Sequence, residues 1–224
     1  MKSFKQYISE APIEYELDSD QSVSQKRPIL GKPIKKFAMM DSGVMKIVTP
    51  KKIGSLSTDS GDYTFHHHTF VDNDPFSKQR QHHIYIGDKE GKIVGIVKGT
   101  VKKIEKSESG KDIHHVGIDM TAIDEGHRGH GLYGHAIRAF IKKFPHVVYS
   151  DMAQTPSAKA TWMNLAKTAE SEGHDVRVHP FMVKTPNEGI PWNKPLDPRS
   201  WEGGNTPLGP VKPEHILFSI RNKK

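Results

Sequence analysis

Residues 124–134, DEGHRGHGLYG, place glycine, arginine and histidine at the entrance of a predicted helix. Glycine is a poor helix former, but it lets a ligand approach the main chain with no side chain in between. A helix N-terminus leaves several N–H groups unpaired and carries a partial positive charge. A strand, a glycine-rich turn and a helix N-terminus therefore predict a cradle for an anionic group such as a pyrophosphate.

Two common phosphate-binding motifs fit this stretch less well. The Walker loop requires Gly-Lys-Ser/Thr, which does not occur here. The dinucleotide fingerprint G-x-G-x-x-G matches GHGLYG literally, and Asp151 would imitate its acidic residue. That fingerprint belongs to a parallel βαβ unit, whereas the β-rich runs on either side of GDKEGK predict a hairpin. The glycine spacing alone is therefore not specific.

The surrounding segments predict the elements that position this turn. Strand-like runs precede it, in VMKIVTP, YTFHHHTF, HHIYIGDKEGKIVGIVKGTVKKIEK and IHHVGIDMTAI. Apolar residues after it share one face of a helix over 131–143, namely Leu132, Ala136, Ile137, Phe140 and Ile141. A strand in HVVYSDM, a helix in PSAKATWMNLAKTAESEG and strands in HDVRVHPFMV and HILFSIRN follow. This order predicts an α+β domain with a mainly antiparallel sheet flanked by helices.

The segment TAIDEGHRGHGLYGHAIRAFI resembles the central motif of the GCN5-related N-acetyltransferases (GNAT), in which an Arg/Gln-x-x-Gly-x-Gly/Ala turn joins a strand to a helix. Arg128, Gly131 and the region around Gly134 match that motif. The next motif of the family is similar to VVYSDMAQTPSAKATWMNLAKTAESEG, with Ser157 at its asparagine position and Ala160 at its alanine. The resemblance covers roughly residues 80–182. It implies a GNAT-like mixed sheet and an acetyl-CoA-dependent N-acetyltransferase.

The resemblance also implies where acetyl-CoA would bind. In this family the amides of the turn hold the pyrophosphate of coenzyme A, and the edge of the preceding strand pairs with the pantetheine arm. The residues that this implies are Ala122, Ile123, Arg128, Gly129, His130, Gly131, Leu132, Tyr133, Gly134 and Ser157.

The sequence departs from the family pattern at two positions. Tyr133 takes the last position of the signature, where glycine or alanine is usual, and Gly134 follows one step later. Asn164 falls near the tyrosine that protonates the leaving thiolate in many members, and asparagine is no acid. Tyr149 is then the candidate donor, with solvent as the alternative.

Transfer to an amine also requires a base that removes a proton from the attacking group. Asp119, on the strand that enters the turn, and Glu125, at the end of that strand, are the candidates. Asp124 and Asp151 are alternatives. Each of these carboxylates equally fits a structural role as a cap of a turn or helix.

Histidines are dense in this chain, with 14 in all, and several are adjacent: 66–68, 82–83 and 114–115. Adjacent histidines on a strand point to opposite faces, so each pair offers one ligand per face. No His-Glu-x-x-His spacing is present. We therefore expect strand histidines and one or two groove histidines, and no metal site. His127 and His130 border the expected phosphate seat, where they would add positive charge at low pH.

The first eleven residues, MKSFKQYISEA, resemble the capsid-targeting peptide of internal head proteins in large tailed bacteriophages of the T-even type. In those leaders Ile/Leu-x-Glu precedes Ala or Gly, and Ile8, Glu10 and Ala11 fit this pattern. The resemblance implies cleavage after Glu10 by a prohead protease. It also implies residence in the virion head, followed by delivery into the host cytoplasm.

Composition narrows the classes of protein that the chain can belong to. Its 33 Lys and Arg exceed its 26 Asp and Glu, for a formal charge of +7, and it has no cysteine. Disulfides, thiol catalysis and thiolate zinc sites are excluded. No apolar run is long enough to span a membrane, and we expect neither a membrane partner nor a secretory signal. The lysines are scattered, which indicates a solvated surface first and a weak nonspecific DNA contact second.

We therefore expect four parts: a cleavable leader at 1–10, an extended arm at 11–43, a GNAT-like domain at 44–183, and a Pro/Trp-rich loop with a final strand at 184–224. The leading function is a virion-packaged N-acetyltransferase of a phage, acting on an amine of a host or phage macromolecule such as a protein. One alternative is a catalytically inactive structural or DNA-associated virion protein with the same fold. Another is a structural protein outside the head that uses 184–213 as an assembly contact.

Overall fold

The computed structural model describes residues 29–41, 44–71, 79–150, 156–180, 190–191 and 216–222. Its helices are α3 (Leu132–Lys143) and α4 (Pro156–Ser171), and a 3-10 turn, η3 (Glu125–His127), precedes α3. Its strands are β1 (Phe37–Asp41), β2 (Val44–Val48), β3 (Lys51–Thr58), β4 (Gly61–Val71), β5 (Arg80–Gly87), β6 (Ile93–Lys106), β7 (Asp112–Ile123), β8 (Val147–Tyr149), β9 (Asp175–Pro180), β10 (Ile190–Pro191) and β11 (Ile216–Arg221).

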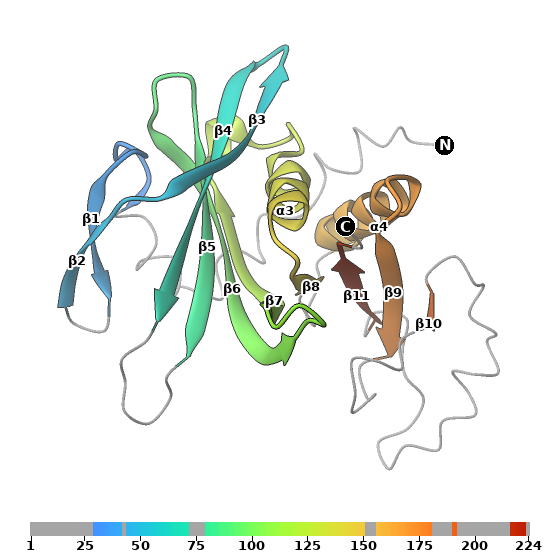
Figure 1. The fold of residues 1–224 in the computed structure, drawn as a ribbon. Coiled ribbons are helices and arrows are strands. Elements are labelled where there is room, and N and C mark those ends of the chain that lie inside the picture. The colour runs from blue at the N-terminus through green and yellow to red at the C-terminus, as the bar shows by residue number, and fades with distance from the viewer. Residues whose placement is uncertain are drawn as a thin grey trace.

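The main sheet has nine described strands in the order β10-β9-β11-β8-β7-β6-β5-β4-β3. Strands β7 and β8 run parallel, and every other neighbouring pair in this sheet is antiparallel. Figure 1 shows β3 to β7 on one side of the molecule and β9, β10 and β11 on the other, with the short β8 between them. The expected α+β architecture with a mostly antiparallel sheet is confirmed.

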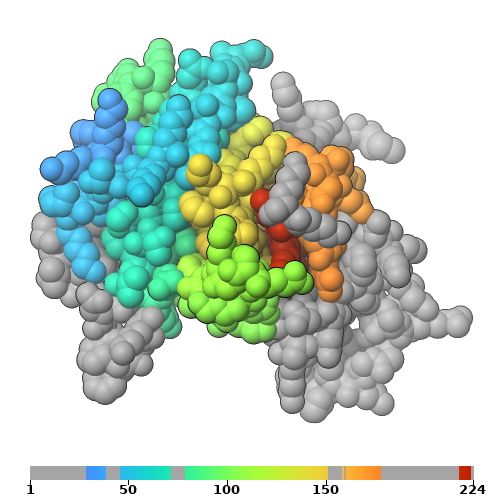
Figure 2. Space-filling model, in the orientation of Figure 1, coloured from blue at the N-terminus to red at the C-terminus, as the bar shows by residue number. Residues whose placement is uncertain are grey.

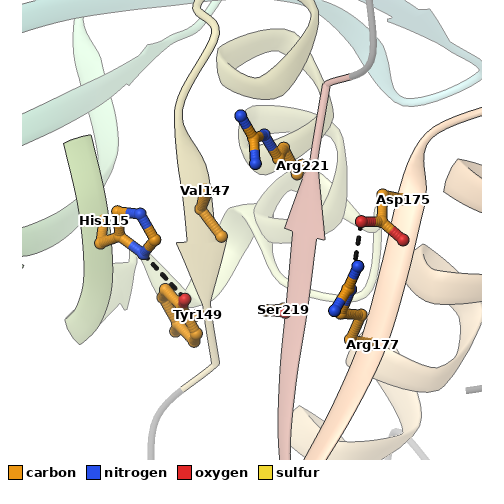
Figure 3. A pocket seen from close by; sticks show the side chains of 7 residues that line it. All are labelled: His115, Val147, Tyr149, Asp175, Arg177, Ser219 and Arg221. Atoms are coloured by element: carbon orange, nitrogen blue, oxygen red, sulfur yellow. Dashed lines mark hydrogen bonds and ion pairs between the residues drawn. The ribbon is translucent and has the colours of Figure 1, made fainter. Parts of the chain in front are cut away.

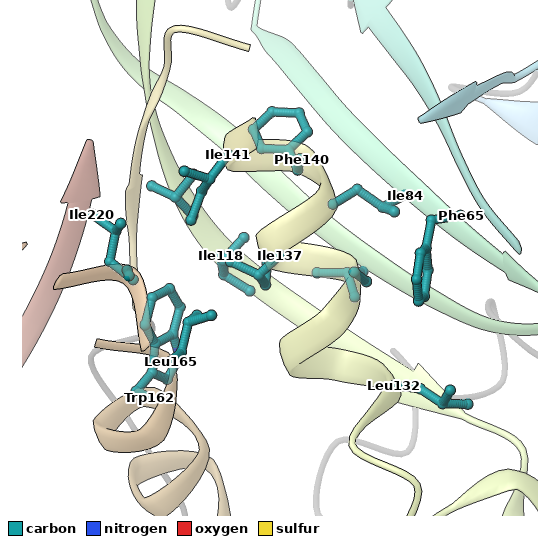
Figure 4. Packing of buried hydrophobic residues seen from close by; sticks show 14 of the residues in the cluster. Phe65, Ile84, Ile118, Leu132, Ile137, Phe140, Ile141, Trp162, Leu165 and Ile220 are labelled. Atoms are coloured by element: carbon teal, nitrogen blue, oxygen red, sulfur yellow. The ribbon is translucent and has the colours of Figure 1, made fainter. Parts of the chain in front are cut away.

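Both helices pack on one face of this sheet and form the larger core with it. The five apolar residues expected on one face of α3 are all buried. Trp162 on α4 is 1% exposed and lies in the same cluster as Phe65, Ile137 and Ile220 (Figure 4). Figure 2 shows α3 in yellow between the cyan strands of the β3–β4 hairpin and the orange α4. The core thus fixes α3, and with it the turn that leads into α3.

Residues 29–41 depart from the expected extended arm. Ile29, Ile34 and Phe37 are buried against the other face of the sheet, in a second cluster that includes Tyr85 on β5. The amide of Gly31 donates to the carbonyl of Ile93 at 2.8 Å, so the main chain is also tied to β6. These residues form turns followed by the β1–β2 hairpin, so their apolar residues follow no single period. The folded part of the chain therefore begins before residue 44.

Strand β3 is a further element that the sequence analysis missed. Its sequence, KKIGSLST, is polar because β3 lies at the edge of the sheet and most of its residues are exposed or half-exposed. The expected leader at 1–10 and most of the Pro/Trp-rich loop lie outside the described residues. Strands β10 and β11 are the described parts of 184–224.

Candidate functional site

The glycine-rich turn connects the end of β7 to the start of α3. Gly129 has φ 82° and Gly131 has φ 67°. This left-handed conformation is unfavourable for residues other than glycine. Gly131 is the N-cap of α3, with no side-chain hydrogen bond to the helix end and no acidic residue in the first turn. The positive end of the helix dipole therefore has no carboxylate of its own helix beside it.

The main-chain amides of this turn fall into two groups. Those of His127 and Arg128 donate to the carbonyls of Asp124 and Glu125, at 2.9 and 3.2 Å. Those of Gly129, His130, Gly131, Leu132 and Gly134 make no hydrogen bond with any described residue. A helix N-terminus leaves such amides unpaired by its geometry. Among the described residues no acceptor faces them.

Two side-chain contacts tie the turn to its surroundings. The hydroxyl of Tyr63, on β4, lies 3.1 Å from His127 Nδ1, and Arg128 Nε donates to the carbonyl of Ile123 at 3.1 Å. Leu132 is 1% exposed, so its side chain belongs to the core and only its main chain faces the turn.

The first turn of α3 packs against α4. The ring of Tyr133 packs edge-on against Trp162, with 6.3 Å between ring centroids. A Cβ on Gly134 would lie 3.5 Å from the methyl group of Thr161, so the two helices approach closely here. The unusual Tyr133 is therefore used in the contact between α3 and α4.

Strand β7 has two different halves. Residues 115–117 pair with β8 on one edge and with β6 on the other. Residues 118–123, which include the expected Ala122 and Ile123, pair with β6, and no described strand pairs with their other edge. The strand edge that leads to the turn is thus not covered by any strand in the described part of the chain.

A bulge lies where the two halves of β7 meet. Met120 pairs with Lys98 and Ile118 with Gly99, so Asp119 is an extra residue on β7. Lys102 is likewise an extra residue on β6, and its Nζ lies 3.1 Å from Asp119 Oδ1. Asp119 therefore already has a cationic partner. Bulges of this kind re-aim main-chain groups and often occur beside active sites.

The remaining expected residues are dispersed. Glu125 is exposed in η3, and Asn164 is exposed on α4. Ser157 lies in the first turn of α4, but its side chain is outside the described residues, as is all of Asp151. Of the three expected catalytic residues, Tyr149 lines a described pocket.

That pocket has a volume of about 190 Å³ and lies on the β7, β8, β11 and β9 part of the sheet (Figure 3). Val116, Val148, Ile220 and Val176 on these strands belong to the helix-covered core. Because side chains alternate along a strand, their neighbours project from the opposite face of the sheet. Those neighbours line the pocket: His115, Val147, Tyr149, Asp175, Arg177, Ser219 and Arg221.

The side chains of Glu105, His115 and Tyr149 form a row, and His115 and Tyr149 in it line this pocket. His115 Nδ1 lies 2.9 Å from the hydroxyl of Tyr149, and His115 Nε2 lies 3.0 Å from Glu105 Oε2. This second contact is within ion-pair distance but does not meet hydrogen-bond geometry. Of these three residues, the sequence pattern pointed to Tyr149 as a catalytic residue but not to Glu105 or His115. The signal was the alternation of the strand, which puts one residue of the pair 114–115 on each face.

Ionisation in this row follows from its contacts. The hydrogen bond from Lys103, and then the contact with His115, lower the pKa of the Glu105 carboxyl to about 2. Burial, then the charge of Glu105, raises the pKa of the Tyr149 phenol. At neutral pH the row therefore holds a carboxylate and a protonated phenol.

A second group of histidines lies in the core, on the helix-covered face. His67, His82 and His114 come from β4, β5 and β7, and His146 comes from the loop before β8. His82 Nε2 lies 2.8 Å from His114 Nδ1, and His82 Nδ1 lies 2.9 Å from His67 Nε2. The expected rule of one histidine per face holds for these strands. His146 was missed because nothing in its local sequence marks it.

Three of these histidines are close enough for their nitrogens to bind one metal ion: in His82, His114 and His146 one nitrogen each lies within 4.8 Å of the others. The second nitrogen of a metal-bound histidine normally donates to an acceptor. Here Arg80 Nη1 lies 2.9 Å from His114 Nε2, and the amide of His114 donates to His146 Nδ1 at 3.2 Å. Both groups are donors, so the surroundings do not fit a resident metal. The expectation of no metal site stays a prediction.

Burial lowers the pKa of each core histidine, with a further contribution from neighbouring positive charge. The pKa falls to about 2 for His82, about 3 for His146 and about 4 for His67. These imidazoles are therefore neutral at pH 7 and take part in the core as a hydrogen-bonded network.

Comparison with known proteins assigns no family to this chain: no protein-family model and no curated protein sequence matches it. In the part of the chain that the structure describes, neither helix is both long and apolar enough to cross a bilayer.

Proposed function

We propose that this protein is an acyl-CoA-dependent N-acetyltransferase with a GNAT-like fold. The observation that carries the proposal is the junction of β7 with α3. There, a strand edge with no described neighbouring strand at residues 118–123 leads into a turn where the amides of 129–132 and 134 make no hydrogen bond with any described residue. Coenzyme A has an extended pantetheine arm that ends in a pyrophosphate. The arm would lie along the strand edge and the pyrophosphate would lie at the turn.

The position of each part supports this assignment. The amides of Gly129, Gly131 and their neighbours, at the positive end of α3, would hold the pyrophosphate. The pantetheine amides would pair with the edge of β7 as an added strand does. From Ile123 back to Gly117 is six residues, or about 20 Å of strand. The thioester would then lie where β7 and β8 separate, beside Tyr149, which pairs with Gly117.

Calorimetric titration of the full chain with coenzyme A tests the proposal. We expect saturable binding, which is weakened in Gly131→Val because a branched side chain is strained at φ 67° and lies over the amides. Gly126→Val is the matched control, because Gly126 lies in the same turn and a Cβ there meets nothing within 4 Å. A folded wild-type chain that does not bind coenzyme A would contradict the proposal.

One observation favours an inactive structural protein of the same fold. Asn164, at the position where the resemblance implies a catalytic tyrosine, is exposed on α4 and supplies no acid. Transfer of a labelled acetyl group to proteins of a cell lysate separates the two functions. Label incorporation that is lost in Gly131→Val would exclude the inactive form.

The proposal extends to packaging in a phage head, which rests on the resemblance of residues 1–11 to a capsid-targeting leader. Those residues lie outside the described part of the chain. Mass spectrometry of purified virions tests it, because cleavage after Glu10 produces a chain that begins at Ala11. An intact Met1 terminus in virions, or absence of the protein from them, would contradict packaging through a cleaved leader.

A further inference from the structure

Glu105 determines which partner donates in the hydrogen bond between His115 and Tyr149. Its carboxylate, ionised at neutral pH, accepts only, so the histidine nitrogen that faces it carries the proton. In a neutral imidazole the other nitrogen is then an acceptor. His115 Nδ1 therefore accepts the hydrogen bond from the Tyr149 hydroxyl at 2.9 Å. In this tautomer the phenolic proton of Tyr149 lies on the side of His115.

This direction suits removal of a proton from a bound group. We propose that Glu105, His115 and Tyr149 form a relay that serves as the general base of the acetyl transfer. As the acceptor amine attacks, its proton passes to the oxygen of Tyr149, and the phenolic proton of Tyr149 passes to His115 Nδ1. The nitrogen–carbonyl bond forms, the sulfur–carbonyl bond breaks, and the coenzyme leaves as a thiolate. The relay gains the proton that the acceptor loses.

The surroundings of the relay favour each part of this step. His115 is 3% exposed, so the imidazolium that forms is held away from water and beside the Glu105 carboxylate. The raised pKa of Tyr149 opposes a free phenolate, so Tyr149 gives up its own proton only as it receives another. Arg177 and Arg221 line the same pocket, and their positive charges lower the pKa of Tyr149. They therefore favour partial negative charge on its oxygen during the transfer.

The relay differs from the roles expected from the sequence. Tyr149 was expected as an acid that protonates the thiolate, whereas its proton is directed toward His115. Asp119 was one of several candidate bases, and its carboxylate is paired with Lys102 at 3.1 Å. This inference rests on the proposed function, because it needs acetyl-CoA at the edge of β7.

Release of free thiol from acetyl-CoA tests the relay, with n-butylamine as a small acceptor that needs no specific recognition. We expect Tyr149→Phe and His115→Gln to lower the rate by about 100-fold at pH 7, the scale of general base catalysis, with unchanged affinity for acetyl-CoA. The ratio of wild-type to variant rates should fall toward 1 as the pH rises past 10.4, about the pKa of an alkylamine, because the amine is then mostly deprotonated. Asp112→Asn, on the same strand as His115 but outside the pocket, should keep the wild-type rate.

Several results would overturn the relay. One is an unchanged rate in both variants at pH 7. Another is a rate ratio that does not depend on pH, which would indicate a purely structural role. Loss of activity in Asp119→Asn together with full activity in Tyr149→Phe would move the base to Asp119. If acetyl-CoA binds but the wild-type chain releases no thiol with butylamine, the relay fails while the coenzyme site stands.

A spectroscopic measurement separates the relay from the coenzyme site. Nitrogen NMR of a histidine-labelled full chain, assigned by the signal lost in His115→Gln, reports which nitrogen of His115 carries the proton. We expect the proton on Nε2 and its redistribution in Glu105→Gln. A proton on Nδ1 in the wild-type chain would overturn the relay whether or not coenzyme A binds.

Discussion

Arg80 Nη1 lies 2.9 Å from His114 Nε2, and this contact orients three buried imidazoles. A guanidinium only donates, so His114 Nε2 accepts and His114 Nδ1 carries the proton. His114 then donates to His82 Nε2 at 2.8 Å, and His82 Nδ1 donates to His67 Nε2 at 2.9 Å. One cation at the start of β5 therefore fixes the tautomers across three strands.

The first prediction concerns these tautomers. In Arg80→Met, His114 Nε2 loses its donor and no cation holds the direction of the chain. We expect nitrogen NMR to show the proton on Nδ1 of His82 and His114 in the wild-type chain, and a mixture of tautomers in the variant. Lys98→Met, which removes another cation from the sheet, should leave the wild-type tautomers unchanged. A wild-type chain with His82 protonated on Nε2 would contradict the inferred direction.

The second prediction concerns stability at acid pH. The pKa values of His67, His82 and His146 are depressed in the folded chain, so between pH 6.5 and about 4 the unfolded chain binds more protons. The free energy of unfolding should therefore be fully developed above pH 6.5 and fall as the pH drops. The expected loss is about 1 kcal/mol per pH unit for each such histidine.

Urea unfolding at pH 7, 6 and 5 measures this loss. His82→Gln should be less stable at pH 7 but should lose less stability per pH unit than the wild-type chain. His130→Gln, outside the core network, should show the wild-type dependence on pH. Equal slopes for His82→Gln and the wild-type chain would show that His82 does not contribute.

The third prediction separates conformational strain at two glycines of the same turn. Gly131 has φ 67°, and a left-handed residue with a side chain costs about 1–2 kcal/mol. We expect Gly131→Ala to lower the free energy of unfolding by about 1 kcal/mol. Gly126→Ala, where a Cβ meets nothing within 4 Å and φ is not positive, should change it little. Equal effects in denaturant unfolding would show that the conformation of Gly131 is not required.

Sequence periodicity anticipated the parts of the fold with one buried face. The face of α3 that carries Ile137 and Phe140 is buried as expected, and the hairpin of β5 and β6 lies around GDKEGK. The packing of residues 29–36 and strand β3 were not predicted. Residues 29–36 pack on the opposite face of the sheet, and β3 lies at its edge. Neither leaves a period in the local sequence.

The candidate site was anticipated only where one short segment builds it. The turn at 129–134 is local, so its glycines and helix end were readable from the sequence. The row of Glu105, His115 and Tyr149 brings together three strands, and its register depends on the bulges at Lys102 and Asp119. A bulge shifts which residues are opposite, and local sequence does not determine it.

The last prediction concerns Trp162, which connects α4 to the residues of the turn. Its side chain is 1% exposed and contacts Tyr133 in the first turn of α3. We expect Trp162→Ala to lower the free energy of unfolding by about 3–5 kcal/mol, because it removes a large buried ring and leaves a cavity. Met163→Ala, at the next position and 40% exposed, should change it by less than about 1 kcal/mol. Because Tyr133 would lose this ring contact, coenzyme A affinity measured well below the unfolding temperature should fall in Trp162→Ala and not in Met163→Ala. Equal losses of stability in the two variants would show that the contact between the helices does not depend on Trp162.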